Sequence, residues 1–340
     1  MTRTKATVLA ASPAALGRRR YLARLSALSA SVLLAKPTLA ADTWPSKTVR
    51  IIVPYTPGTG MDILARTLAP PLSNTWGQAV VVENRPGASG NIGANAVAKA
   101  TPDGLTLLMG VNTLIINPSL YATMSYDPLK DLAAIGLCTT GSFLLVANSG
   151  ANIRSVEQLV QRARAKPGSL DYASPGIATP HMMAMELFKL QTKTSITHIP
   201  FSGTAGAVSA VLSGDVPLMF LPVHVALAQV KSGRLVALAA SGDRRSSLAP
   251  DVPTLGELGF KGIEADLWYG LLAPAGTPAN LIRKINADLL QALAVPEVKT
   301  VLTAQGMEIA SSSPAEMATL MRRDFQRWAS VIKRVGIRAD

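Results

Sequence analysis

Two glycine-rich turns near the start of the chain have residue types and spacing suited to binding an anion. The first spans residues 56–62 (Thr-Pro-Gly-Thr-Gly-Met-Asp) after the strand-like run 49–55, and the second spans 86–93 (Pro-Gly-Ala-Ser-Gly-Asn-Ile-Gly) after the strand-like run 79–85. Each pattern is typical of a strand that ends in a turn and then opens a helix. Such a turn presents unpaired backbone N–H groups at the positive end of a helix dipole. The pair therefore predicts a site for a carboxylate or a phosphate.

The first turn does not complete a nucleotide-binding fingerprint. Gly58 and Gly60 begin the pattern G-x-G-x-x-G, but the third glycine would fall at position 63, where the chain has Ile63. Neither turn is followed by the Gly-Lys-Ser/Thr of a P-loop. Asp62 is expected to sit at the helix start because the dipole favours a carboxylate there. A direct contact from Asp62 to the ligand is disfavoured, because its charge would repel an anion.

Two further turns occur at equivalent places in the second half of the chain. Residues 173–179 (Ala-Ser-Pro-Gly-Ile-Ala-Thr) and 201–206 (Phe-Ser-Gly-Thr-Ala-Gly) each follow a strand-like run and precede a helix-like run. Both supply hydroxyls and bare backbone amides, and facing turns can clamp a small polar ligand. Ordinary α/β connections capped by Ser and Thr are the alternative. The recurrence of four such turns favours a binding site.

Signatures of catalysis and of metal binding are missing from the sequence. It contains no G-x-S-x-G elbow and no S-x-x-K with supporting partners. His181, His198 and His224 show no metal-ligand spacing with cysteine or carboxylates. His181 begins a helix and can face a cleft, whereas His198 alternates with apolar residues in a strand. Cys138, the single cysteine, is expected to be a buried, inert thiol, so we predict no catalytic residue, no metal and no cofactor.

The first forty residues have the features of an export signal. A basic cluster, Arg18-Arg19-Arg20, precedes an apolar run at 25–35, and Thr38-Leu39-Ala40 offers the small residues that a signal peptidase reads. The apolar run is shorter than the ~20 residues that a membrane span needs. Residues 18–22 resemble the twin-arginine pattern, although an ordinary secretory signal fits equally well. Either route predicts a periplasmic protein, cleaved near Ala40.

Cleavage of the signal removes most of the excess positive charge. The whole chain has 33 basic and 21 acidic residues, and residues 1–41 contain basic residues but no acidic ones. The mature protein is therefore only mildly basic. This balance is weak evidence for nucleic-acid binding and suits capture of a small anion. No other run is apolar for long enough to span a membrane, so the mature protein is expected to be soluble.

Around the turns, the expected elements form two α/β units. Strand-like runs at 49–55, 80–82 and 105–111 alternate with helix-like runs at 62–73 and 91–100, which predicts a parallel sheet covered by helices. A second series of the same kind extends from residue 155, an expected helix N-cap, to residue 240.

Two long apolar runs, 133–148 and 266–274, are suited to cross between the units, and the chain after them has helical periodicity. We therefore expect two α/β lobes joined by two crossing strands, with the ligand in the cleft at the strand carboxyl ends. The expected segments are an export signal at 1–41, a first lobe at 42–142 and 268–340, and a second lobe at 143–267.

Several motifs together resemble the tripartite tricarboxylate transporter substrate-binding proteins, which include the Bordetella uptake gene group. The most specific is 81–93 (Val-Val-Glu-Asn-Arg-Pro-Gly-Ala-Ser-Gly-Asn-Ile-Gly). Further matches are Trp44-Pro45 and the segments 52–66, 102–108, 117–121, 248–254 and 269–278. The resemblance covers essentially the whole mature chain.

The resemblance implies an α/β fold, that of a two-lobed periplasmic binding protein (type II, flytrap-like). It implies a receptor that captures a small organic carboxylate and delivers it to membrane transporter subunits of the tripartite tricarboxylate type. A monomer is the expected state, and Venus flytrap closure the expected motion. In such receptors, turns of both lobes hold the ligand. Together with His181, this gives the predicted ligand-binding residues: Pro57, Gly58, Thr59, Gly60, Met61, Asn84, Gly87, Ala88, Ser89, Ser174, Gly176, Thr179, His181, Phe201, Ser202, Gly203 and Thr204.

Three departures from the family pattern bear on the ligand. Members commonly have Pro-Gly-Gly-Gly-Thr-Asp where residues 57–62 read Pro-Gly-Thr-Gly-Met-Asp, and Tyr-Lys-Gly or Tyr-Arg-Gly where 201–203 read Phe-Ser-Gly. An aspartate is common where Leu221 stands. These changes make the second lobe's side of the cleft more apolar. We therefore expect a ligand with one carboxylate and an apolar or aromatic remainder.

Two other functions remain open from the sequence. A periplasmic sensor would present the same solute to a signalling partner without transport. An exported hydrolase would depend on a residue such as His181 or Ser174, although the sequence supplies no credible triad.

Overall fold

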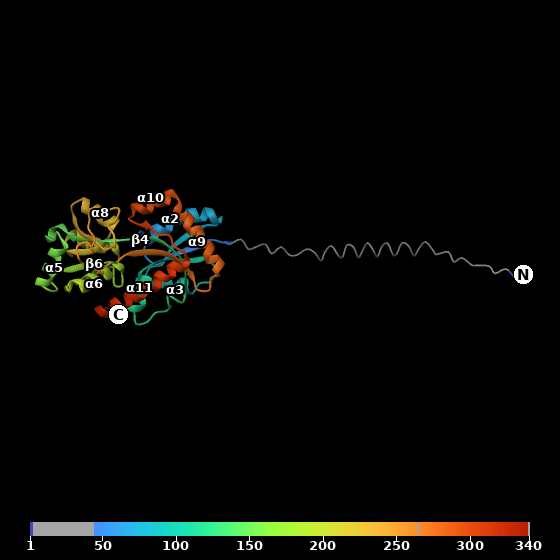
Figure 1. Ribbon diagram of the computed structural model, residues 1–340, viewed down its shortest axis with the longest axis horizontal. Helices are drawn as coiled ribbons and strands as arrows, with labels where there is room; N and C mark the ends of the chain where they lie inside the picture. The colour runs from blue at the N-terminus through green and yellow to red at the C-terminus, as the bar shows by residue number, and fades with distance from the viewer. Residues whose placement is uncertain (3–43, 264, 339–340) are drawn as a thin grey trace. The chain divides into compact units, whose positions relative to one another are not determined.

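The computed structural model describes residues 1–2, 44–263 and 265–338 (Figure 1). Nearly all of the predicted export signal at 1–41 lies outside the described residues, so it stays a prediction. From Lys47 onward the chain forms one compact unit. Within the described residues, no helix combines the length and apolar character that crossing a membrane requires.

The first sheet has the strand order β11-β4-β10-β3-β1-β2. Three strands in it are parallel, β1 (Val49–Val53), β2 (Val80–Asn84) and β3 (Thr106–Val111), with β1 between the other two. The remaining strands are antiparallel to their neighbours: β4 (Leu132–Gly141), β10 (Leu267–Pro274) and β11 (Glu308–Ile309). The strands predicted at 49–55, 80–82 and 105–111 are therefore parallel as expected, but the sheet as a whole is mixed because β10 lies antiparallel beside β3.

The second sheet repeats this arrangement, with the order β7-β6-β8-β5-β9. Its parallel strands are β6 (Asp171–Ser174), β7 (Thr197–Pro200) and β8 (Leu218–Pro222), and β6 lies between the other two. Antiparallel to β8 lies β5 (Phe143–Asn148), which also pairs with β9 (Leu235–Ala240). The order β7-β6-β8-β5 thus matches β2-β1-β3-β10 strand for strand.

Helices cover both sheets, and Figure 1 shows α5, α6 and α8 gathered around the second sheet and α2, α9 and α10 around the first. The helices that accompany the first sheet are α2 (Gly60–Trp76), α3 (Asn91–Ala98), α4 (Thr113–Ile116), α9 (Ala279–Ala294), α10 (Pro296–Ala304) and α11 (Pro314–Val335). Those that accompany the second sheet are α5 (Val156–Ala165), α6 (Pro180–Thr192), α7 (Thr204–Ser213) and α8 (Val223–Lys231). Short 3₁₀ turns are η1 (Ala88–Gly90), η2 (Asn117–Ser119) and η3 (Ser149–Ala151). We call the elements of the first sheet the first lobe and those of the second sheet the second lobe.

Each lobe has its own apolar core. Ile51, Leu64 and Leu107 of the first lobe are fully buried. In the second lobe, Val146 and Met219 belong to a buried cluster formed by the sheet with α7 and α8. Both cores form because helices cover the two faces of each sheet, so the continuous apolar runs of its strands are buried on both sides.

The chain crosses between the lobes at two places. The run predicted as one strand at 133–148 is two strands, β4 and β5, which belong to different sheets and meet at Ser142. The return passes from β9 through 241–266 to β10. Ser241 ties the crossing segments together, because its Oγ accepts the N–H of Phe143 (3.0 Å) and donates to the carbonyl of Ala265 (3.2 Å).

Local signals in the sequence set several helix starts. Ser155 is the N-cap of α5, and its Oγ accepts the N–H of Gln158. Ser313 and Glu316 form a capping box at the start of α11. The thiol of Cys138 is fully buried in β4, and burial raises its pKa to about 12, as expected for an inert cysteine.

Candidate functional site

A cavity of about 260 Å³ lies where the carboxyl ends of the parallel strands of both lobes meet. In open α/β sheets this is the usual place for a ligand, since strand order reverses there. The first lobe contributes residues after β1 and β3 and two residues of β10, and the second lobe contributes residues after β6, β7 and β8. The lining residues are Tyr55, Thr56, Pro57, Gly58, Thr59, Gly60, Met61, Val111, Thr113, Pro175, Thr179, Pro180, His181, Gly203, Thr204, Ala205, Pro222, His224, Val225, Leu267 and Tyr269.

The amino ends of several helices converge on this cavity. The N-caps of α2, α7 and α8 are Thr59, Gly203 and Pro222, and none of them caps its helix with a side chain. By contrast, Thr179 caps α6, because its Oγ1 accepts the N–H of Met182 (3.5 Å). The first N–H groups of a helix have no partner within the helix, and they lie at the positive end of its dipole. The cavity is therefore suited to an anion that accepts hydrogen bonds from backbone amides.

The cavity wall contains no Asp, Glu, Lys or Arg among the described residues that line it. Its polar side chains are hydroxyls, among them Thr56 and Tyr269, and two imidazoles. The other lining side chains are apolar, such as Met61 and Leu267. An anion in this cavity would be held by N–H and O–H donors rather than by an ion pair.

The first glycine-rich turn is held in shape by a buried carboxylate behind it. Asp62 is 4% exposed; its Oδ2 accepts the N–H of Gly58 (2.9 Å), and its Oδ1 accepts Nε of Arg66 (3.0 Å) and Nδ2 of Asn84 (2.9 Å). Nδ2 of Asn84 also donates to the carbonyl of Tyr55 (3.0 Å). Burial alone would raise the pKa of Asp62, but these hydrogen bonds and the charge of Arg66 bring it below its ordinary value. Asp62 thus stays ionised and positions the turn without lining the cavity.

Asn84, which the sequence assigns to the ligand, lies outside the cavity wall and supports this turn. Gly87, Ala88 and Ser89 of the second glycine-rich turn also lie outside the wall. Ser89 instead joins the lobes, because its Oγ donates to the carbonyl of Ile177 (3.1 Å) and accepts the hydroxyl of Tyr121 (3.0 Å).

In the second lobe, four of the predicted residues line the cavity: Thr179, His181, Gly203 and Thr204. The other predicted residues of this lobe lie outside the cavity wall: Ser174, Gly176, Phe201 and Ser202.

Ser174 is fully buried and lies under the turn that carries Thr179. Its Oγ is 2.6 Å from Nε2 of His198, 2.9 Å from the carbonyl of Gly176 and 3.2 Å from the N–H of Gly176. The hydroxyl therefore bonds to both backbone groups of Gly176 in the turn and to His198 of the neighbouring strand β7. A serine nucleophile must reach its substrate. This buried serine is placed to shape the turn, and the Ser174–His198 pair does not provide the site of a hydrolase.

The two imidazoles of the cavity differ in what they offer a ligand. Both ring nitrogens of His181 are buried without a hydrogen-bond partner among the described residues, and its ring packs against Phe143 with centroids 4.8 Å apart. Burial lowers the pKa of His181 to about 3, so the ring is neutral at neutral pH. His224 is half-buried, and its ring nitrogens are not enclosed in this way.

Several lining residues were not predicted from the sequence, including Val111 and Thr113 at the end of β3, Pro222 and Val225 at the end of β8, and Tyr269 in β10. The signal that could have found the first four is positional, because they lie at or just beyond the carboxyl ends of parallel strands, as the predicted turns do. Tyr269 could not be found in this way, since it lies inside an antiparallel strand.

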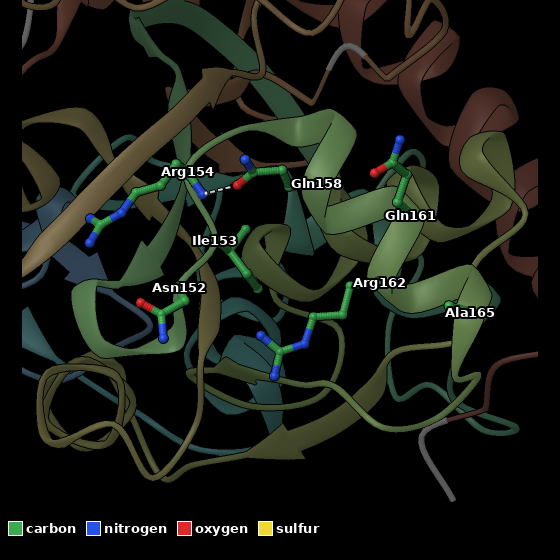
Figure 2. Close-up of a pocket in the computed structure, with 7 residues that line it drawn as sticks. All are labelled: Asn152, Ile153, Arg154, Gln158, Gln161, Arg162 and Ala165. Atoms are coloured by element: carbon green, nitrogen blue, oxygen red, sulfur yellow. Dashed lines mark hydrogen bonds between the residues drawn. The ribbon is translucent and has the colours of Figure 1, made fainter.

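A larger depression, of about 480 Å³, lies beside α5 in the second lobe (Figure 2). Two of its bonds are local: the N–H of Arg154 donates to Gln158 (2.8 Å), as Figure 2 shows, and Arg162 donates to the carbonyl of Ala151 in the preceding turn (2.7 Å). Because it involves one helix and the turn before it, and no strand carboxyl end, it is a weaker candidate site than the cavity.

Comparisons with known proteins agree with this geometry. The model of the family described as "Tripartite tricarboxylate transporter family receptor" matches residues 64–337. The chain belongs to this family. Protein BugT of Bordetella pertussis is 34% identical over 319 residues, which cover 93% of this chain and 98% of BugT.

Solved structures show the same two-lobed fold of periplasmic binding proteins, which confirms the predicted fold class. Rpa4515 of R. palustris, solved with adipate, superposes with a TM-score of 0.81 at 31% identity, covering 87% of this chain and 99% of that one. The periplasmic binding protein BugD superposes with a TM-score of 0.79 at 29% identity, again covering 87% and 99%. The receptor is thus a solute-binding protein of the tripartite tricarboxylate transporter type.

Proposed function

We propose that this receptor captures a small organic carboxylate in the cavity between its lobes and delivers it to the membrane subunits of a tripartite tricarboxylate transporter. The observation that carries the proposal is the convergence of uncapped helix N-termini from both lobes on a cavity without charged lining residues among those described. A carboxylate has two oxygens that accept N–H donors, and helix dipoles stabilise its charge. The structure of Rpa4515 with adipate supports the same class of ligand.

The cavity favours binding over catalysis. Its wall offers donors that can hold an anion, but the buried Ser174 is not placed to act as a nucleophile. Among the described residues, no group of His, Cys, Asp and Glu is arranged to hold a metal ion. The protein acts as a receptor that releases its ligand unchanged.

Ligand capture closes the two lobes about the crossing segments. The first lobe comprises 42–142 and 268–340, and the second comprises 143–267. These boundaries are supported by β4 ending at Gly141, β5 beginning at Phe143 and β10 beginning at Leu267. Small backbone rotations at such segments, near the Ser241 contacts, are enough for hinge motion. A ligand that contacts both lobes stabilises the closed form, which a transporter can then recognise.

The protein works in the periplasm as a monomer. The export signal expected at 1–41 and the periplasmic location of BugD support this location. A bilobal receptor that encloses its ligand within one chain has no need of a second copy to complete the site.

Identification of the natural ligand tests the proposed function. The protein is purified from its own host, small molecules are released by denaturation, and mass spectrometry compares them with those from an unrelated exported protein. We expect enrichment of a carboxylate that then raises the melting temperature of ligand-free protein in a concentration-dependent way. Enrichment of a compound without a carboxylate would contradict the proposal.

A further inference from the structure

His224 is the lining imidazole with accessible nitrogens. It is the second helical residue of α8, after the N-cap Pro222 and Val223. The residue lines the cavity and is half-buried. No described residue bonds to its ring, whereas the nitrogens of His181 are enclosed by protein. A ligand can therefore reach His224 but not the nitrogens of His181.

Neighbouring backbone fixes the position of His224. The Val223 N–H donates to the carbonyl of Ser142 at the lobe crossing (3.3 Å). Gly306 of the first lobe lies close by, since a Cβ built on it would be 3.3 Å from the backbone nitrogen of His224 and 3.5 Å from its Cβ. The imidazole is thus held at the junction of the two lobes, where a ligand that touches both lobes must lie.

The charge state of His224 limits what it can bind. Burial lowers its pKa, and no charged group of the described residues contributes to that shift. The ring is therefore neutral at neutral pH, with one N–H donor and one acceptor nitrogen. A hydroxyl can both donate and accept, so it matches either nitrogen. A second carboxylate beside this ring could accept only the single N–H of the neutral imidazole, and its charge would be poorly compensated once its water is lost.

We propose that His224 is the specificity-determining residue of this cavity, and that it selects a carboxylate whose remainder is uncharged and bears a hydroxyl. The carboxylate lies at the N-termini of α2 and α7, and the hydroxyl bonds to the imidazole at the start of α8, where the first N–H already donates to the carbonyl of Ser142. Apolar side chains such as Met61, Val111 and Leu267 cover the carbon atoms between them. The volume of about 260 Å³ restricts the ligand to a compact molecule, since pockets for drug-sized ligands run from about 300 to 1,000 Å³. This inference rests on the proposed function and names the class of its ligand.

Matched probes test the proposal. Isothermal titration calorimetry is run at pH 7.5 with three series of straight-chain acids of four to seven carbons: unsubstituted acids, their terminal hydroxy acids and the corresponding diacids, for example hexanoate, 6-hydroxyhexanoate and adipate. We expect one hydroxy acid to bind at least about tenfold more tightly than both partners of the same length, as loss of one hydrogen bond in a desolvated site implies.

Two variants assign that preference to the imidazole. In His224→Leu the hydroxy acid should lose its advantage over the unsubstituted acid of the same length. In His224→Gln, which keeps a donor and an acceptor, part of the advantage should return. Unchanged melting temperatures of the ligand-free variants show that both are folded.

The outcomes separate the two proposals. If a diacid binds most tightly, or if the hydroxy-acid preference survives in His224→Leu, the role of His224 is overturned while the carboxylate receptor stands. If no member of the three series binds, and the natural ligand identified by mass spectrometry has no carboxylate, both proposals fail.

Discussion

The hydroxyl of Tyr269 lies against Gly60, on the side where any other residue would have its Cβ. A Cβ built on Gly60 would be 2.6 Å from Oη of Tyr269 and 3.0 Å from Cε of Met307. Gly60 is the first residue of α2, and Tyr269 belongs to β10, so this contact joins the first glycine-rich turn to a central strand of the first sheet. Both residues line the cavity. The glycine is required here by the closeness of the tyrosine and not by a left-handed backbone.

Gly60→Ala should therefore displace the Tyr269 ring. We expect a loss of about 1–3 kcal/mol in the free energy of unfolding, as is usual when a packed site gains a methyl group, together with weaker ligand binding. Urea denaturation and calorimetry measure the two effects. Because the closest clash is with the hydroxyl, Tyr269→Phe combined with Gly60→Ala should recover part of the stability. A double variant that is no more stable than Gly60→Ala would show that the clash lies elsewhere.

Backbone N–H groups at α7 are expected to hold the ligand, and a proline can remove one of them. Thr204 is the first residue of α7, a position where proline is tolerated, as Pro180, Pro296 and Pro314 show at the starts of α6, α10 and α11. Thr204→Pro should keep the fold but weaken carboxylate binding about tenfold, because a hydrogen bond to a charged group contributes about 1.5–3 kcal/mol.

Thr204→Ala is the matched control, because it removes the same hydroxyl and keeps the N–H. A loss of affinity that is equal in the two variants would assign the effect to the hydroxyl and contradict a role for the amide. Calorimetric titration with the natural ligand measures both.

The sequence predicted the backbone turns that line the cavity better than the individual side chains in its wall. Residues 57–61 all line the cavity, because a turn at the end of a parallel strand must open toward the carboxyl edge of the sheet. Asn84 ends β2 and Ser89 lies in the turn that follows, yet both side chains bond to other parts of the protein. Asn84 donates to the carbonyl of Tyr55 and to Asp62, and Ser89 donates to the carbonyl of Ile177. Whether a polar side chain bonds to other protein groups or stays available to a ligand depends on tertiary contacts. A local sequence pattern does not contain that information.

The same limit applies to strands and histidines. The run 133–148 reads as one strand because its apolar residues are continuous, but its halves pair in different sheets. His181 was predicted to bind the ligand because it begins a helix, yet its ring nitrogens are enclosed by protein. His224, which was not predicted as a ligand-binding residue, lines the same cavity and keeps its ring nitrogens accessible. Burial of individual ring atoms is set by packing from distant elements, here Phe143 of β5.

Asn84→Ala should weaken ligand binding although the side chain is not in the cavity wall. It removes donors to the Tyr55 carbonyl and to Asp62, and the acceptor of Arg66, whose Nη2 lies 3.0 Å away. We expect about 1–3 kcal/mol lower stability, because partly buried polar partners are left unpaired, and a several-fold higher Kd through a looser 56–62 turn. Full affinity in a destabilised variant would show that the turn keeps its shape without Asn84.

Ser89→Ala should favour the open form of the receptor. The Oγ of Ser89 provides a hydrogen bond between the lobes, to the carbonyl of Ile177, and a Cβ alone cannot replace it. Small-angle X-ray scattering of the ligand-bound variant should show a larger radius of gyration than the bound wild type, with faster ligand release in stopped-flow experiments. Thr75→Val serves as a control for the release rate, because it removes a hydroxyl that donates to the carbonyl of Pro71 within α2 (3.0 Å) and lies outside the cavity wall. Identical scattering curves for bound Ser89→Ala and bound wild type would contradict a latch at this position.

The free energy of unfolding should depend on pH in a way that reveals the low pKa of the enclosed His181 imidazole. In the folded protein its pKa is lowered to about 3, whereas the ordinary value is 6.5. Between these values the unfolded chain binds a proton that the folded protein does not, so stability falls as the pH falls from about 6.5 toward 3, by up to about 1.4 kcal/mol per pH unit. His181→Leu removes this term, because leucine does not titrate. The free energy of unfolding of the variant, relative to the wild type, should therefore rise steadily in urea denaturation series from pH 7 to pH 4. A difference that stays constant across this range would mean that the folded protein accepts the proton on His181, and that the ring is not enclosed in solution.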